Sequence, residues 1–168
     1  MRNRLNIIIA ASLLGLLSCG REPLPATCPA VGDALPAFSV RMETGETVTS
    51  EDLSLGRCLL VFFHTGCPDC VRELEDLQPF YDRHGAELRL VLISRSEGPE
   101  SVREYWRAHG YTMPYSAQKD RRVYDLFSRS GIPYVLLVQD GVIRGIWNDR
   151  DMFSEEEYRS LVGEPRKD

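Results

Sequence analysis

The sequence LLVFFHTGCPDC, residues 59–70, decides the fold. Its first five residues form an apolar, aromatic and β-branched run that predicts a buried strand. After it, Val71, Leu74, Leu77 and Phe80 recur at helical spacing with charged residues between them, which predicts an amphipathic helix. Two cysteines, three residues apart, therefore lie where a strand gives way to a helix.

The Cys67–Cys70 pair has the spacing of a redox-active disulfide. On the first turn of a helix the two Cα atoms fall about 5–6 Å apart, which a disulfide tolerates. Unpaired N–H groups and the helix dipole favour a thiolate at Cys67, and Pro68 suits the first helical position. We therefore expect Cys67 to attack a substrate disulfide and Cys70 to resolve the mixed disulfide.

Asp69 refines this expectation. Its carboxylate opposes a thiolate at Cys67, and a less stabilised dithiol makes a more reducing couple, so we predict a reductant. A zinc site would need further ligands, and the chain has no second Cys-x-x-Cys and no His-x-x-x-His. A purely structural bridge over three residues would constrain the unfolded chain little. We expect no metal and no cofactor beyond the Cys67–Cys70 disulfide.

The first 18 residues predict a lipoprotein signal peptide. Arg2 and Arg4 precede an apolar run at 7–17 that is too short to span a membrane. Residues 16–19, LLSC, resemble the lipobox of bacterial lipoproteins, which implies cleavage before Cys19 and lipidation of that cysteine. A plain secretory signal is the alternative. Either way we expect the bacterial cell envelope, lipid-anchored in the first case and facing the periplasm or exterior, where disulfides persist.

Composition limits the partners. The chain has 25 acidic and 20 basic residues and a net charge of −5, without a basic cluster, which argues against nucleic acid as a partner. Its length suits one domain with its own core, and we expect a monomer. The predicted organisation is a lipidated tether at 19–36, one domain at 37–163 and a C-terminal tail at 164–168.

The other segments predict a mixed α/β sheet. A hairpin is expected around Gly45, a short capped turn at 50–53, and strands at 88–93, 134–138 and 142–147, the last two joined by Asp140-Gly141. Further helices are expected after Pro99, over 121–128 and after Ser154. This order predicts a mixed sheet with helices on both faces.

That order, with Cys67-Pro68-Asp69-Cys70 at the strand-to-helix turn and Gly131-Ile132-Pro133 before the last hairpin, resembles the thioredoxin superfamily. More narrowly it resembles the TlpA/ResA-like thiol-disulfide oxidoreductases. The resemblance implies a thioredoxin-like fold with an N-terminal β-hairpin extension, membrane attachment, protein substrates with disulfides or thiols, and a membrane electron donor that the sequence does not identify. It places the family's cis-proline on Pro133, with the backbone of Ile132 beside Cys67.

Some positions depart from the family pattern. Gly66 stands where the family usually has Trp, and Val61 stands where thioredoxins bury an acid. Cys70 therefore needs another proton acceptor. Glu97 or Glu100 are candidates for the glutamate of ResA-like proteins, with a solvated surface position as the alternative.

Three further side chains are left open by the sequence. His64 is close enough along the chain to tune the active site, or it is an ordinary strand-end residue. Cys28 and Cys58 flank the hairpin and are candidates for a structural disulfide that closes about thirty residues and contributes about 3 kcal/mol. Alternatively, Cys58 is a buried apolar side chain and Cys28 a free thiol.

Two rival functions fit the sequence less well. A thiol peroxidase would carry Thr-x-x-Cys, whereas Thr65 is one place too close to Cys67. A copper chaperone of this fold would carry Cys-x-x-x-Cys and a distant His. The leading expectation is an extracytoplasmic, membrane-anchored thiol-disulfide oxidoreductase that reduces protein disulfides.

Overall fold

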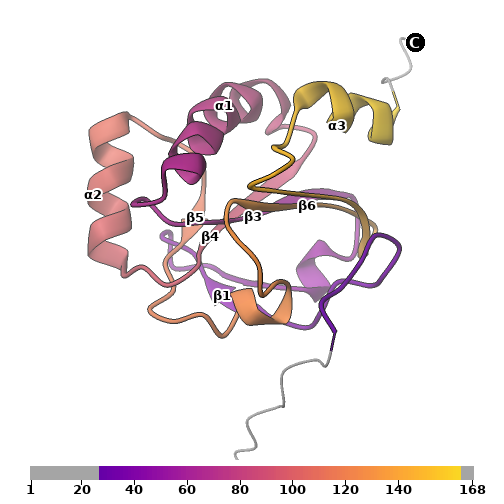
Figure 1. The fold of residues 1–168 in the computed structure, drawn as a ribbon, viewed down its shortest axis with the longest axis horizontal. Coiled ribbons are helices and arrows are strands. Elements are labelled where there is room, and N and C mark those ends of the chain that lie inside the picture. The colour runs from indigo at the N-terminus through magenta and orange to yellow at the C-terminus, as the bar shows by residue number, and fades with distance from the viewer. Residues whose placement is uncertain (1–26, 164–168) are drawn as a thin grey trace, which may run out of the picture.

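The computed structural model describes residues 27–163, so the predicted signal peptide, Cys19 and the C-terminal tail lie outside the described residues. A five-stranded mixed sheet forms the centre, in the order β5-β4-β3-β6-β7 (Figure 1). Its strands are β3 (Arg57–Phe63), β4 (Arg89–Ser94), β5 (Tyr115–Ser116), β6 (Tyr134–Gln139) and β7 (Val142–Asn148). The predicted mixed sheet is confirmed, and β5 is a strand that the sequence did not predict.

Strand register brings three loops to one edge of the sheet. β3 is parallel to β4, with Phe63 opposite Ser94, so both strands end at the same edge. β3 is antiparallel to β6, with Phe62 opposite Tyr134, so β6 begins at that edge. The loops after β3, after β4 and before β6 therefore meet, as expected for strand ends of an α/β sheet.

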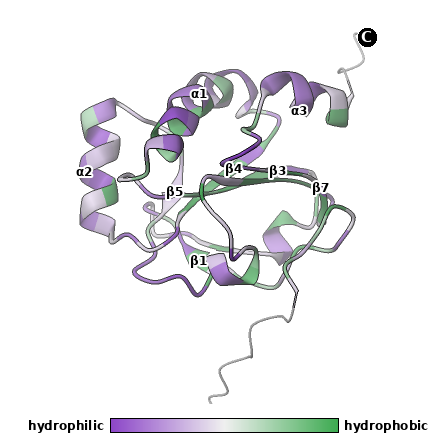
Figure 2. Ribbon diagram, viewed as in Figure 1, coloured by the Kyte–Doolittle hydropathy of each residue, from purple (hydrophilic) through white to green (hydrophobic). Residues whose placement is uncertain are grey.

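The central strands are buried on both faces, which explains their nearly continuous apolar sequence. Every residue of β3 from Cys58 to Phe63 is at most 2% exposed. Figure 2 shows hydrophobic residues concentrated in the strands, whereas hydrophilic residues prevail in the helices.

The helices α1 (Pro68–His84) and α3 (Glu155–Val162) cover one face of the sheet, with α2 (Pro99–His109) beside α1 (Figure 1). As predicted, Pro68 and Pro99 occupy first-turn positions, where a missing N–H is tolerated. Ser154 caps α3 by accepting a hydrogen bond from the Glu157 N–H at 3.3 Å. These three predicted helices are confirmed.

The other face is covered by the hairpin of β1 (Ser39–Arg41) and β2 (Thr47–Thr49) and by two single-turn 3-10 helices, η1 (Glu51–Leu53) and η2 (Tyr124–Leu126). Phe127 joins these layers, because its ring lies 5.5 Å from that of Phe38 and 5.0 Å from that of Phe62. The predicted N-terminal hairpin and helices on both faces are thus present. The predicted capped turn forms at η1, although its cap is Thr49 and not Ser50: the Thr49 hydroxyl accepts from the Asp52 N–H at 3.3 Å.

The helix predicted over 121–128 is wrong in extent, because only the single turn η2 forms. The Tyr124 hydroxyl donates to the carbonyls of Ser130 and Gly131 at 2.7 and 2.8 Å. The Tyr124 ring also packs 5.4 Å from that of Phe62. These contacts direct the chain back towards β6 before a second helical turn.

The last part of the predicted tether belongs to the folded body. The Gly32 N–H donates to the Ile143 carbonyl and the Leu35 N–H to the Gly141 carbonyl, both at 2.9 Å. Residues 32–35 therefore run along the start of β7, and the folded body begins before residue 37. Within residues 27–163, no helix combines the length and apolar character that a membrane span requires.

Candidate active site

Cys67 occupies the N-cap of α1. Its extended backbone (φ −97°, ψ 117°) turns the chain from β3 into the helix, and its Sγ accepts a hydrogen bond from the Cys70 N–H at 3.4 Å. Sulfur here takes the place of the usual capping oxygen. The side chain is half-buried, and both cysteines are thiols. A partly accessible sulfur at a helix N-terminus suits a nucleophile.

Cys70 lies one turn inside α1 and is fully buried. Burial raises the pKa of its thiol well above the ordinary range, and the hydrogen bond with Cys67 raises it further. Arg95 opposes part of this rise through its charge. Cys70 is therefore held as a neutral thiol, and it must lose a proton before it can attack a mixed disulfide.

The loop before β6 completes the site. The Ile132–Pro133 peptide bond is cis, as the sequence resemblance implied. The Cys67 Sγ donates to the Ile132 carbonyl at 3.4 Å, so this backbone lies directly beside the sulfur. The antiparallel pairing of β3 with β6 produces this approach, since Tyr134 stands opposite Phe62.

Glu97 is buried at this site instead of lying in a solvated position. It is 7% exposed, and its Oε2 accepts from the Thr65 N–H at 2.9 Å. Its Oε1 accepts from the hydroxyls of Thr65 and Ser101. Burial alone would raise the Glu97 pKa, but these hydrogen bonds and the nearby His64 outweigh it and lower the pKa. Glu97 therefore holds the active-site loop as a carboxylate, whereas Glu100 is exposed.

His64 is tied to the same loop. Its Nδ1 accepts a hydrogen bond from the Gly66 N–H at 2.9 Å and lies 3.8 Å from the Glu97 Oε2. An accepting Nδ1 places the ring proton of neutral His64 on Nε2. The structure thus brings His64 and Glu97 together beside Cys67, and their role in tuning it stays a prediction.

Asp69 has a cationic partner that the sequence reasoning did not consider. Its Oδ1 forms an ion pair with the Arg72 guanidinium, one turn along α1. This charge offsets part of the repulsion between the Asp69 carboxylate and a Cys67 thiolate. Asp69 therefore favours a reducing couple less strongly than the sequence alone suggests.

Glu73 is a buried acid that the sequence reasoning missed. It follows Cys70 by one turn on the same helix face and is 2% exposed, and its Oε1 has no hydrogen-bond partner among residues 27–163. Burial raises its pKa to about 7, the Asp76 charge contributes, and a hydrogen bond from the Phe153 backbone partly opposes the rise. Its burial could have been predicted from the sequence, because Glu73 lies with Leu74 on a helix stripe that is otherwise apolar.

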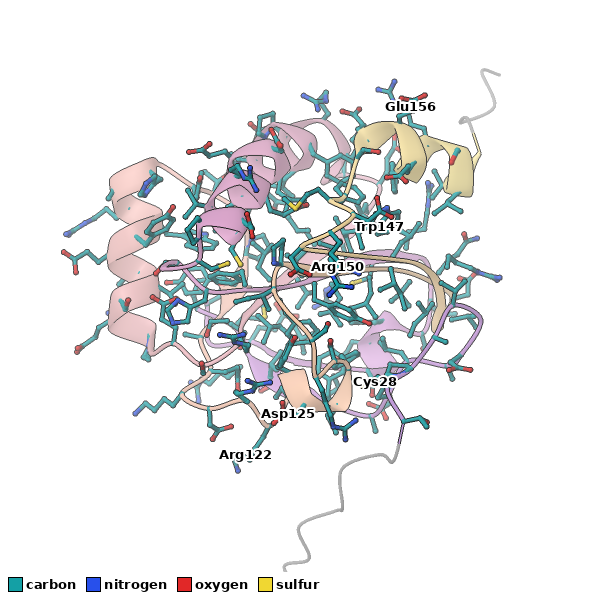
Figure 3. All side chains as sticks on the ribbon, viewed as in Figure 1. Cys28, Arg122, Asp125, Trp147, Arg150 and Glu156 are labelled. Carbon is teal, nitrogen blue, oxygen red and sulfur yellow. The ribbon has the colours of Figure 1, made fainter. Side chains whose placement is uncertain are left out.

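Cys28 and Cys58 are both free thiols, so the candidate disulfide is absent from the described structure. Cys28 lies on the η2 side of the sheet, where its Sγ accepts from the Arg129 guanidinium at 3.4 Å (Figure 3). Its charge also contributes to the pKa of Tyr134, at the start of β6. Cys58 is instead buried within β3, opposite Val138 of β6.

The described residues contain no group of three or more His, Cys, Asp or Glu side chains arranged to hold a metal ion. Thr65 is the threonine that was compared with the Thr-x-x-Cys motif of thiol peroxidases. Its hydroxyl donates a hydrogen bond to Glu97.

The fold and this paired-cysteine site define a thiol-disulfide oxidoreductase of the thioredoxin fold. The profile of the AhpC/TSA family matches residues 31–146, and the chain belongs to this family. It is 30% identical over 116 residues to sporulation thiol-disulfide oxidoreductase A of Bacillus subtilis, covering 64% of this chain and 67% of that protein. It is 23% identical over 108 residues to thiol-disulfide oxidoreductase ResA of the same organism, covering 64% and 60%.

Solved structures agree on the fold. StoA from Bacillus subtilis matches with a TM-score of 0.64 at 21% identity, covering 77% of this chain and 99% of that chain. A thio-disulfide isomerase from Thermus thermophilus matches with a TM-score of 0.65 at 23% identity, covering 80% and 98%. The chain thus spans nearly all of these structures but about two thirds of the curated relatives.

Proposed function

We propose that this protein reduces protein disulfides outside the cytoplasm through the Cys67–Cys70 dithiol, held at the membrane by lipid on Cys19. The observation that carries the redox proposal is the pairing of a partly accessible Cys67 with a buried Cys70, beside the backbone of a cis-proline loop. The proposed lipid anchor rests on the sequence of residues 16–19.

The first step is attack by the Cys67 thiolate on one sulfur of the substrate disulfide. A bond forms between that sulfur and the Cys67 Sγ, and the other substrate sulfur leaves as a thiolate and takes a proton from water. The Ile132 backbone supports this step, because an extended substrate segment can pair with it while its sulfur faces Cys67.

The second step needs a proton acceptor for Cys70. Glu73 is suited to this task, since it lies one helical turn away and has a pKa of about 7. Cys70 passes its proton to the Glu73 carboxylate and attacks the Cys67 Sγ, which releases the second substrate thiolate. The products are the Cys67–Cys70 disulfide and two substrate thiols. An external dithiol donor must return two electrons before the next cycle.

Trapping tests this proposal. A Cys70→Ala variant should accumulate mixed disulfides at Cys67 when it is mixed with a disulfide-bonded protein such as insulin, whereas Cys67→Ala should accumulate none. The wild-type protein should reduce insulin with dithiothreitol as donor. Failure to reduce insulin, together with catalysed consumption of peroxide, would replace the proposal with the thiol peroxidase alternative.

The membrane attachment needs its own test, because Cys19 lies outside the described residues. In a bacterial host, a Cys19→Ala variant should lose incorporation of labelled palmitate and move from the membrane fraction to the soluble envelope fraction. Unchanged labelling would show that lipid is attached elsewhere or that the segment is a plain secretory signal.

A further inference from the structure

A hollow of about 390 Å³ opens beside the nucleophile, lined by His64, Gly66, Cys67, Arg95, Gly131 and Ile132. Its walls come from the three loops that meet at one edge of the sheet. The size falls in the range of small-ligand sites, about 300–1,000 Å³, so it can receive a substrate side chain next to the attacked sulfur. Arg95 is the lining residue with a permanent charge.

The backbone of Arg95 is fixed, while its guanidinium forms no ion pair with the carboxylates that the structure describes. Its N–H donates to the Phe63 carbonyl at 2.8 Å, which continues the β3–β4 pairing into the loop. The guanidinium carbon lies 5.9 Å from the centre of the Tyr124 ring. The Arg95 Nε is buried without a hydrogen-bond acceptor. An arginine has five N–H donors and no acceptor, so this side chain can still bind an anion.

Arg95 differs from six arginines of the described chain that pair with carboxylates. Ion pairs of this kind are formed by Arg72, Arg83, Arg89, Arg121, Arg122 and Arg159. In residues 27–163 no carboxylate forms an ion pair with Arg95. Arg95 therefore places a guanidinium without a carboxylate partner in residues 27–163 beside the nucleophile, in a chain of net charge −5.

The carboxylates nearest the site do not neutralise this charge. Glu97 accepts hydrogen bonds from Thr65 and Ser101, and Asp69 pairs with Arg72. Asp149 lies beside Gly131, since a Cβ built on Gly131 would stand 2.7 Å from its Oδ2. An incoming anion is thus favoured on the Arg95 side of the hollow and disfavoured at Gly131.

We propose that Arg95 selects the substrate of this site by binding a carboxylate next to the attacked disulfide. The preferred substrate is then an extended protein segment with Asp or Glu beside its half-cystine. This deepens the proposed function and rests on it. The segment pairs with the Ile132 backbone, its sulfur faces Cys67, and the neighbouring carboxylate enters the hollow and accepts hydrogen bonds from the guanidinium. The electron balance is that of the two exchange steps above, and Arg95 exchanges no proton.

Two oxidised peptides test this, identical except for Glu or Gln beside the cystine. The rate constant for mixed-disulfide formation is measured by stopped flow with each peptide, and the ratio of the two is compared between variants. Since the ratio is taken within one variant, changes in the nucleophilicity of Cys67 cancel. For the wild type we expect a ratio of about five in favour of Glu, as a partly exposed charge pair is worth about 1 kcal/mol. Added salt should reduce it.

Arg95→Gln should bring the ratio to about one, and Arg95→Lys should retain about half of the preference, because it keeps the charge but not the planar fork. Arg121→Gln is the matched control. Arg121 also lies over the Tyr124 ring, at 5.2 Å, but it pairs with Asp125 and does not line the hollow, so its ratio should stay at the wild-type value.

The outcomes separate the two proposals. If neither peptide reacts at Cys67, the proposed function fails. If both react and the wild-type ratio is one, or if Arg95→Gln keeps the preference, the assignment of Arg95 is wrong while the function stands. A third arm uses dithiobis(nitrobenzoate) as a small anionic disulfide. If Arg95→Gln slows this reagent selectively but leaves the peptide ratio unchanged, the site selects small anions, and the claim for acidic protein segments is refuted.

Discussion

The buried carboxyl of Glu73 should make the stability of the reduced protein depend on pH, and Glu73→Gln should remove this dependence. The folded chain raises the pKa of Glu73 from 4.5 to about 7, and burial is the main cause. The folded state therefore holds the proton more tightly than the unfolded state. The stabilisation that protonated Glu73 gives the folded state is present in full below pH 4.5 and is lost as the pH rises through about 7.

The magnitude follows from the two pKa values. A tenfold change in proton affinity equals about 1.4 kcal/mol, so complete ionisation of Glu73 costs about 3 kcal/mol of folding free energy. Most of this, about 2.5 kcal/mol, falls between pH 5 and pH 8. Glutamine cannot ionise, although its buried amide adds a cost that is the same at every pH. Relative to the wild type, the variant should thus gain about 2.5 kcal/mol from pH 5 to pH 8.

The assay is urea unfolding followed by tryptophan fluorescence at pH 5, 6, 7 and 8, with a reductant that keeps Cys70 a thiol. Glu75→Gln is the matched control, because Glu75 lies on the same helix but is exposed. Its stability difference from the wild type should stay within about 0.5 kcal/mol at every pH. A difference for Glu73→Gln that is constant across this range would refute the assignment of a raised pKa to Glu73.

Three further results are expected. Glu97→Gln should destabilise the fold by about 1–3 kcal/mol in urea unfolding and slow mixed-disulfide formation, because an amide cannot accept all of the hydrogen bonds that hold the active-site loop. Unchanged stability and an unchanged rate would contradict this role of Glu97. Burial raises the pKa of Cys58 to about 12. Alkylation at pH 8, mapped by mass spectrometry, should therefore label Cys67 far faster than Cys58 in the native protein. The difference between the two rates should vanish in urea. Hydrogen bonding to Arg83 lowers the pKa of Glu155 to about 2, so the stability it contributes is present above pH 4.5 and lost as the pH falls towards 2. Glu155→Gln should cost at most about 1 kcal/mol at pH 7 and nothing at pH 2; an equal cost at both pH values would contradict the ion pair.

The sequence predicted most of the fold because the elements around the site have strong local signals. Short local patterns were enough to predict these elements. They are the apolar run at 59–63, the prolines at helix starts and the Asp140-Gly141 turn. Asp140 and Gly141 both have positive φ, at 52° and 76°, as a two-residue hairpin turn requires. β5 had no such signal, since it has only two residues and forms through its pairing with β4.

The site was predicted in part, and the misses are tertiary effects. The cysteine pair and Pro133 are visible as a motif, but the burial of Glu97 follows from the β3–β4 register and could not be deduced from a loop of uncertain length. The distance between Cys28 and Cys58 likewise depends on how the chain before residue 37 runs along the sheet. Glu73 was within reach, because a carboxylate on an apolar helix stripe is itself a signal.

The most direct test is a redox titration of the reduced protein in dithiol buffers of defined potential, with quenching, alkylation in urea and mass mapping of every cysteine. We predict that Cys67 and Cys70 become protected from alkylation together, as one two-electron couple, while Cys28 and Cys58 continue to be alkylated at every potential. The midpoint should lie nearer −270 mV than −120 mV, as for a reductant. A disulfide that joins Cys28 to Cys58, or a Cys67–Cys70 pair that stays reduced in oxidising buffer, would contradict the central claim.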